Sequence, residues 1–207
     1  MSKSDFLIRR LVDGLSGWLV YQQAAKTQCN SEYSLYAPIE HIATLRGWKV
    51  VQQQKLVRTE GAVGAPKQVD FLFYREPTMA RGTTVVLEVK YLRASNASAD
   101  RAALVKDMNK LSSISLENLQ GFEDSEEFVK PKRFLLVAAQ RSPFLTLTKS
   151  TSGNGLPAAK LLKKALREDK PEDVYETTAI THLTERIEWI VAAFGERAWA
   201  NLIQQAD

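Results

Sequence analysis

Two stretches of the sequence decide the fold: VDFLFY at residues 69–74 and TTVVLEVKYL at residues 83–92. Both are rich in β-branched and aromatic residues, which favour strands. Residues 76–82 lie between them and include Pro77 and Gly82, which are typical of a turn. The two stretches therefore predict a β-hairpin with a seven-residue connection.

The alternation of side chains along each strand fixes the register of this hairpin. Matching the apolar faces pairs Phe71 with Leu87, and the next pair sets Asp70 directly opposite Glu88. Two facing carboxylates repel each other, whereas a divalent cation between them reverses the sign of the interaction. Lys90 lies on the same face, two residues beyond Glu88. The pattern predicts a charged site, and the alternative is an ion pair of Lys90 with either carboxylate on a solvated face.

Hydrophobic periodicity predicts further elements around the hairpin. They are helices at about residues 4–26, 32–46 and 100–116, and strands at about 48–57 and 133–139. A helix between the third and fourth strands is the usual crossover that joins parallel neighbours. We predict a single α/β domain with an αβββαβ core at residues 31–140. An N-terminal helix precedes it at 1–30, and a helical C-terminal extension follows at 141–207, with its last helix at about 187–202.

Composition narrows the chemistry. The net charge of +4 is compatible with a polyanionic partner. Cys29 is the only cysteine, which excludes an internal disulfide and a cysteine-rich zinc site, and two histidines make a histidine site improbable. A bound metal would then be held by oxygen ligands, which favours Mg²⁺ or Mn²⁺. Because no apolar run reaches the roughly 18 residues of a membrane span, we expect a cytoplasmic protein without a membrane partner.

Asp70, seventeen intervening residues and then Glu88-Val89-Lys90 on a hairpin resemble the signature of the PD-(D/E)XK nucleases, the restriction-endonuclease-like superfamily. The resemblance covers about residues 31–140, and Val69 stands where that motif has its proline. It implies that Asp70, Glu88 and the backbone carbonyl of Val89 bind Mg²⁺ or Mn²⁺. It also implies that Lys90 orients or activates the attacking water and stabilises the charge of the transition state.

In nucleases of this kind, a glutamate of the first core helix often completes the metal shell. Glu32 falls on the apolar stripe of the helix predicted at residues 32–46, and Glu40 lies just beyond its edge. This favours Glu32. If the helix starts only at Pro38, as proline at a first helical position allows, Glu40 is the better candidate.

Two further groups of residues are candidates for accessory roles. Asp107, together with Lys110, could assist at the site, although an exposed ion pair on a helix is the favoured interpretation of these two. Contacts to nucleic acid are predicted, with solvated side chains as the alternative, for Lys55, Arg58, Lys67, Lys160, Lys163, Lys164 and Arg167.

Together these features predict a Mg²⁺-dependent nuclease, either an endonuclease or an exonuclease, that acts on DNA rather than RNA. The resemblance suggests a context of restriction, phage defence, mobile elements or repair, and a homodimer or partner subunits are compatible with it. The alternative is a module on the same fold that binds nucleic acid or protein without cleaving.

Overall fold

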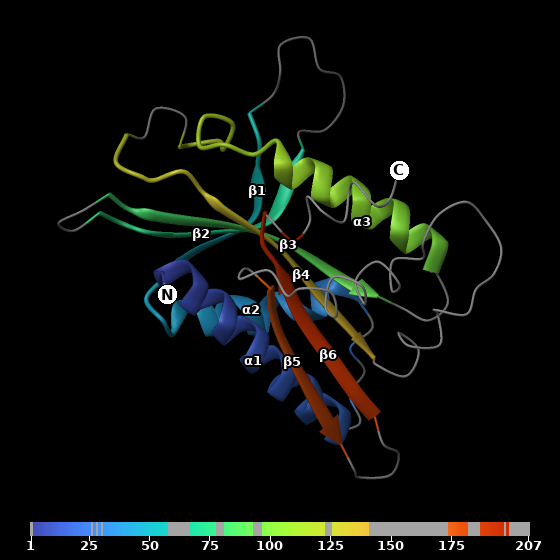
Figure 1. Cartoon of the computed structure of the whole chain (residues 1–207). Coiled ribbons are helices and arrows are strands. Elements are labelled where there is room, and N and C mark those ends of the chain that lie inside the picture. Colours follow the sequence, from blue (N-terminus) through green and yellow to red (C-terminus); the bar gives the residue numbers. More distant parts are fainter. Residues whose placement is uncertain are drawn as a thin grey trace.

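The computed structural model describes residues 2–25, 27, 29, 31–57, 67–77, 81–92, 97–122, 126–140, 174–181, 187–196 and 198. They form a mixed α/β structure in which helices flank a six-stranded mixed sheet (Figure 1). The helical elements are α1 (Lys3–Ala24), the 3₁₀ helix η1 (Glu32–Leu35), α2 (Tyr36–Thr44) and α3 (Ala97–Ser112). The strands are β1 (Lys49–Lys55), β2 (Gln68–Arg75), β3 (Thr83–Leu92), β4 (Lys132–Gln140), β5 (Val174–Thr181) and β6 (Ile187–Phe194).

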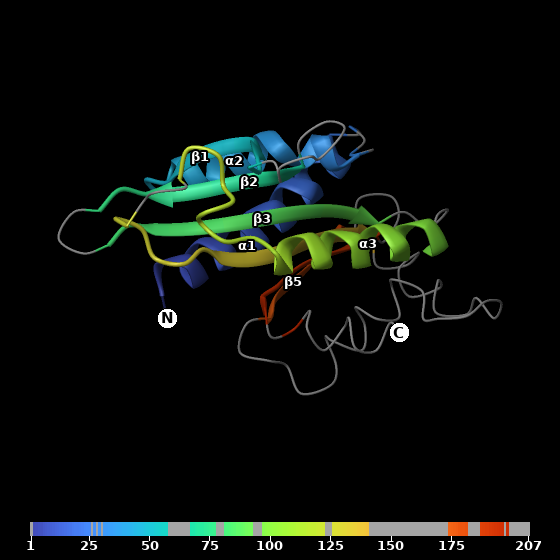
Figure 2. The ribbon, with the colours of Figure 1, turned by 90° about the horizontal axis from the view of Figure 1, so that it is seen from above.

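The sheet has the strand order β1-β2-β3-β4-β6-β5. Strands β3 and β4 pair in parallel and are joined through α3, whereas the other neighbouring strands are antiparallel. One hydrophobic cluster lies under α3, and a second lies between the sheet and the pair α1 and α2. Helices α2 and α3 therefore lie on opposite sides of β2 and β3 (Figure 2). Within the described residues, no helix is long and apolar enough to cross a membrane.

The predicted hairpin register is confirmed as far as the strands pair. Phe71 faces Leu87 and Phe73 faces Val85, as the matching of apolar faces requires. The helix, three strands, helix and strand predicted around this hairpin also appear in that order.

The regular alternation of β2 breaks at Asp70. Phe71 and Phe73 pack on the side of α1 and α2, but Val69 belongs to the cluster under α3, so the alternation expected along residues 69–74, which would place all three on one face, is wrong at Val69. In the neighbouring strand, Gln53 has a left-handed φ of 51° between the pairs Gln52–Phe71 and Gln54–Val69. This conformation is uncommon for a residue other than glycine. It distorts β1 opposite Asp70 and accompanies the change of face.

The prediction of a helical C-terminal extension is wrong for the described residues, because β5 and β6 are strands at one edge of the sheet. Residues 187–194 are apolar at nearly every position, so helical spacing is matched there by chance. Their burial alternates as in a strand: Trp189, Val191 and Ala193 pack on the α1 side, and Ile190, Ala192 and Phe194 pack on the α3 side. The part of the predicted helical extension that contains Lys160, Lys163, Lys164 and Arg167 lies outside the described residues.

Arg133 of β4 fixes the C-terminal end of α3. One nitrogen of its buried guanidinium donates to the carbonyls of Leu111 (3.3 Å), Ser112 (2.8 Å) and Ile114 (3.2 Å). Its other nitrogens donate to the Glu196 carboxylate at 2.8 and 2.6 Å. The last carbonyls of a helix have no partner within the helix. Arg133 therefore satisfies them and holds α3 against the sheet.

Candidate functional site

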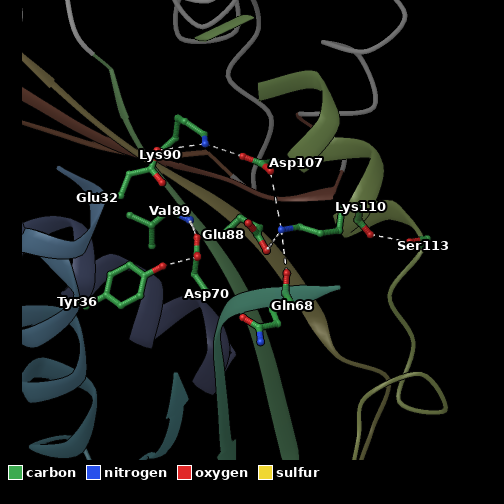
Figure 3. Close-up of polar contacts among 10 residues, drawn as sticks. All are labelled: Glu32, Tyr36, Gln68, Asp70, Glu88, Val89, Lys90, Asp107, Lys110 and Ser113. Carbon is green, nitrogen blue, oxygen red and sulfur yellow. Dashed lines mark hydrogen bonds and ion pairs between the residues drawn. The ribbon is translucent and has the colours of Figure 1, made fainter. Parts of the chain in front are cut away.

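Asp70 lies where the pairing of β2 with β3 ends. The main-chain N–H of Val89 donates to Asp70 Oδ2 at 2.7 Å, and the hydroxyl of Tyr36 donates to Asp70 Oδ1 (Figure 3). The last paired residues on this side are Phe71 and Leu87. The Asp70 carboxylate thus accepts a hydrogen bond from the Val89 N–H beyond the last backbone pair, and it links β2 to both β3 and α2.

Glu88, which follows Leu87 on β3, is a buried carboxylate with only 2% of its surface exposed. The ammonium of Lys110 lies 2.7 Å from its Oε1, but this ion pair lacks hydrogen-bond geometry, so Oε1 has no hydrogen-bond donor among the described residues. Burial raises the pKa of Glu88 to about 8; the charge of Asp70 adds to the rise, and Lys110 opposes it. The effect of burial on the pKa of Glu88 prevails, because one neighbouring cation does not replace the full hydration that a carboxylate has in water.

Lys90 is held between two carboxylates. Its ammonium lies 2.8 Å from Asp107 Oδ2 and 3.1 Å from Glu32 Oε1, and the side chain is 12% exposed (Figure 3). Burial alone would lower the pKa of Lys90. The hydrogen bond and charge of Asp107, together with Glu32, outweigh burial and hold the pKa above its ordinary value. Lys90 is therefore a fixed positive charge and not a proton acceptor at neutral pH.

Asp107 links the two lysines of the site. Its second oxygen lies 3.8 Å from the ammonium of Lys110, one helical turn further along α3. With 15% and 21% of their side chains exposed, Asp107 and Lys110 face the hairpin. The interpretation of this pair as an exposed ion pair is thus wrong. Three-residue spacing places both side chains on one side of the helix, and that side packs over Glu88 and Lys90.

Of the two helix glutamates, the structure brings Glu32 and not Glu40 to this cluster. Glu32 opens η1 and reaches Lys90, whereas Glu40 is exposed and accepts a hydrogen bond from Gln52 of β1. Helix α2 starts at Tyr36, two residues before Pro38. Proline is tolerated there because the first turn needs no internal N–H partner.

Tyr36 is a member of the site that the pattern of apolar residues predicts only as a packing group. Its ring packs against Phe71 at a centroid distance of 4.8 Å, and its hydroxyl reaches Asp70. Burial and the charge and hydrogen bond of Asp70 raise its pKa. A buried tyrosine hydroxyl needs a hydrogen-bond partner. Tyr36 also lies four residues after Glu32, which places it near the same face of the predicted helix. These two facts are the signal in the sequence that could have identified Tyr36 as a site residue.

The predicted contacts to nucleic acid are described in part. Lys55 at the end of β1 and Lys67 just before β2 are exposed, and the main-chain N–H of Leu56 donates to the carbonyl of Lys67 at 2.8 Å. These two lysines therefore lie near each other. The remaining candidates, Arg58, Lys160, Lys163, Lys164 and Arg167, lie outside the described residues.

The residues fit a metal site made of two carboxylates but not a cage of protein ligands. In the described part of the chain, no three His, Cys, Asp or Glu side chains come together as a metal-ligating group. Mg²⁺ often takes only one or two carboxylates and completes its shell with water and substrate phosphate. Glu88 Oε1, buried and without a hydrogen-bond donor, has the lone pairs that such an ion needs. Coordination by the Val89 carbonyl stays a prediction.

The variant Asp70→Asn tests whether the negative charge of Asp70 lowers the stability of the folded protein when no metal is bound. The asparagine can accept from Val89 and donate to Tyr36, while the repulsion with Glu88 disappears. We expect the variant to melt in EDTA at the same or a higher temperature than the wild type, and to lose stabilisation by added Mg²⁺. Asp70→Ala is the control: it lacks both hydrogen bonds and should lose about 1–3 kcal/mol. A marked destabilisation of Asp70→Asn would instead show that this charge supports the fold.

Comparison of the chain with models of protein families, with curated proteins and with solved structures gave no match. The functional argument therefore starts from the geometry of the site.

Proposed function

We propose that this chain is a Mg²⁺- or Mn²⁺-dependent nuclease of the PD-(D/E)XK type that hydrolyses phosphodiester bonds, in DNA rather than RNA. The observation that carries the proposal is the position of Asp70 and Glu88. Asp70 directly precedes Phe71 and Glu88 directly follows Leu87, the last paired residues of the hairpin, and Lys90 comes two positions after Glu88 on β3. The same arrangement underlies the resemblance of the motif to that superfamily. The parallel pair β3 and β4, joined through α3, is compatible with its αβββαβ core.

The residues suit hydrolysis of a phosphodiester. Asp70 and Glu88 would hold the cation, which supplies an acidified water and neutralises charge on the phosphate when it is bound. Lys90 adds a preorganised positive charge for the transition state. Its high pKa supports this role over that of a general base. Glu32 and Asp107 fix the direction of the Lys90 ammonium, which makes them positioning residues.

One observation favours the second candidate, a non-cleaving binding module on the same fold. In the structure Lys90 pairs with Glu32 and Asp107, and Lys110 pairs with Glu88, so two lysines offset part of the negative charge of the cluster without a metal. A module that only binds could use this network for stability and the exposed lysines Lys55 and Lys67 for contacts to phosphate.

Cleavage assays decide between the two. Purified protein should nick or degrade nucleic acid in Mg²⁺ or Mn²⁺, and EDTA should abolish this activity. Ca²⁺ should support binding with little turnover, because its looser shell positions water poorly. Glu32→Gln should lower the rate, and Glu40→Gln, outside the cluster, is the matched control that should not. If folded protein leaves single- and double-stranded DNA and RNA intact, the binding module is the better assignment.

A further inference from the structure

The ammonium of Lys110 is surrounded by oxygen atoms from three secondary-structure elements. Glu88 Oε1 of β3 lies 2.7 Å away, the carbonyl of Gln68 on β2 accepts a hydrogen bond at 3.0 Å, and Asp107 Oδ1 of α3 lies at 3.8 Å (Figure 3). Two carboxylates and a backbone carbonyl are also the kind of ligands that a hard divalent cation takes. Lys110 thus occupies Glu88 Oε1, the oxygen that a metal held by Asp70 and Glu88 would use.

From this geometry we infer that Lys110 is a tethered cation that occupies the cation position at Glu88 in the metal-free protein and is displaced when a divalent metal binds. The inference rests on the metal site of the proposed function. Glu88 Oε1 is buried and receives no hydrogen bond from the described residues, so the Lys110 charge is its nearest compensation. A metal at this oxygen supplies a larger charge to the same place. The two cations would repel each other if both stayed.

Asp107 offers the displaced ammonium a place to go. It lies three residues before Lys110 on the same helix, and its Oδ1 is 3.8 Å from the ammonium, just beyond close contact. A change of the Lys110 side-chain rotamer can shorten this distance without moving α3, whose end is held by Arg133. The other oxygen of Asp107 remains with Lys90. Metal uptake would then leave both lysines on Asp107, near the reacting phosphate.

Lys110→Met tests the inference through metal affinity. Wild-type protein must break the contact between Lys110 and Glu88 before it binds metal. Its apparent affinity for the metal is therefore reduced in proportion to the small fraction of molecules in which Lys110 has left Glu88. We expect calorimetric titration with Mg²⁺ to show binding about tenfold or more tighter in Lys110→Met. A proton competes with Mg²⁺ for Glu88 once Lys110 is removed, so both proteins are titrated from about pH 7 to about pH 9, and the difference in affinity should reach its full size at the upper end of this range.

Two matched variants separate displacement from other effects. Lys106→Met removes the same charge from an exposed position of α3 and should leave the Mg²⁺ affinity close to that of the wild type. Lys110→Arg keeps a cation at the site and should not tighten binding. The inference is overturned if Lys110→Met binds Mg²⁺ no more tightly than the wild type, or if Lys106→Met tightens binding as much.

A measurement on the wild-type protein covers the case in which Lys110→Met does not fold. In NMR spectra of ¹³C-lysine-labelled protein, saturating Mg²⁺ should shift the ε-methylene signal of Lys110 and not that of Lys106. An unchanged Lys110 signal in Mg²⁺-bound protein contradicts displacement. Tighter binding by Lys110→Met without any cleavage would keep this inference and reject the nuclease. Metal-dependent cleavage with unchanged affinity would do the reverse, and no Mg²⁺ binding by wild type or variant would reject both.

Discussion

Lys90→Met should lower the single-turnover rate of nucleic-acid cleavage by about a hundredfold or more, because loss of one preorganised charge typically costs that much. The effect belongs in the rate and not in ground-state affinity, since Lys90 is proposed to act on charge that develops in the transition state. Methionine nearly preserves the length of the buried side chain, so the change is mainly one of charge. Single-turnover kinetics and the affinity for nucleic acid in Ca²⁺ measure the two quantities separately.

The control for Lys90 is the exposed Lys67, which lies outside the charged cluster. Lys67→Ala should weaken binding and its salt dependence if it contacts phosphate, with little change in the maximal rate. Because Lys90→Met leaves Glu32 and Asp107 without their shared cation, its fold must be checked by thermal unfolding. Lys90→Arg keeps the charge and should recover part of the rate. A Lys90→Met variant that cleaves at the wild-type rate would contradict the assignment of the motif.

Glu88→Gln should abolish metal-dependent cleavage and also remove a pH-dependent cost in stability. The pKa of Glu88 is raised from 4.5 to about 8 in the folded chain. Between these values the folded state binds more protons than the unfolded state, so this group makes the wild type less stable as pH rises. At 1.36 kcal/mol per pKa unit the cost above pH 8 is at most about 5 kcal/mol. The variant loses the partner of Lys110, which reduces the gain.

Urea unfolding in EDTA at pH 5, 7 and 9 measures this difference. The free energy of unfolding of Glu88→Gln should be close to that of the wild type at pH 5 and should exceed it increasingly towards pH 9. Glu40→Gln removes one negative charge from an exposed position and serves as the control. Added Mg²⁺ should stabilise the wild type and not Glu88→Gln. A difference between Glu88→Gln and wild type that does not change with pH would contradict a buried, protonated Glu88.

The hairpin and its carboxylates could be predicted from sequence because they depend on local rules. Alternation along residues 69–74 and 83–92 fixes which side chains face each other, and the pairs Phe71–Leu87 and Phe73–Val85 follow from it. The same rule failed at Val69, since the left-handed Gln53 that accompanies the change of face lies on another strand and has no signal in the sequence of β2.

Tertiary context decided the features that could not be predicted. Residues 187–194 satisfy both helical and strand spacing because nearly all are apolar, and only pairing with β4 and β5 makes them a strand. The sequence favours an exposed position for Lys110, because it does not show which side of α3 packs over Glu88. Sequence spacing thus placed the residues of the hairpin, while the side chains contributed by α2 and α3 depended on packing.

Arg133 has a consequence for the order in which the site assembles. Asp70, Glu88 and Lys90 lie within one hairpin. A hairpin depends on contacts between residues that are close in sequence, and such contacts can form early in folding. The end of α3 is held by Arg133, and Arg133 is itself held by Glu196, which comes more than a hundred residues after Asp70. Asp107 and Lys110 are therefore fixed over the hairpin only after β4 and the residues that follow β6 have docked. We therefore expect a folding chain to bring Asp70 and Glu88 together first and to place Lys110 beside Glu88 last.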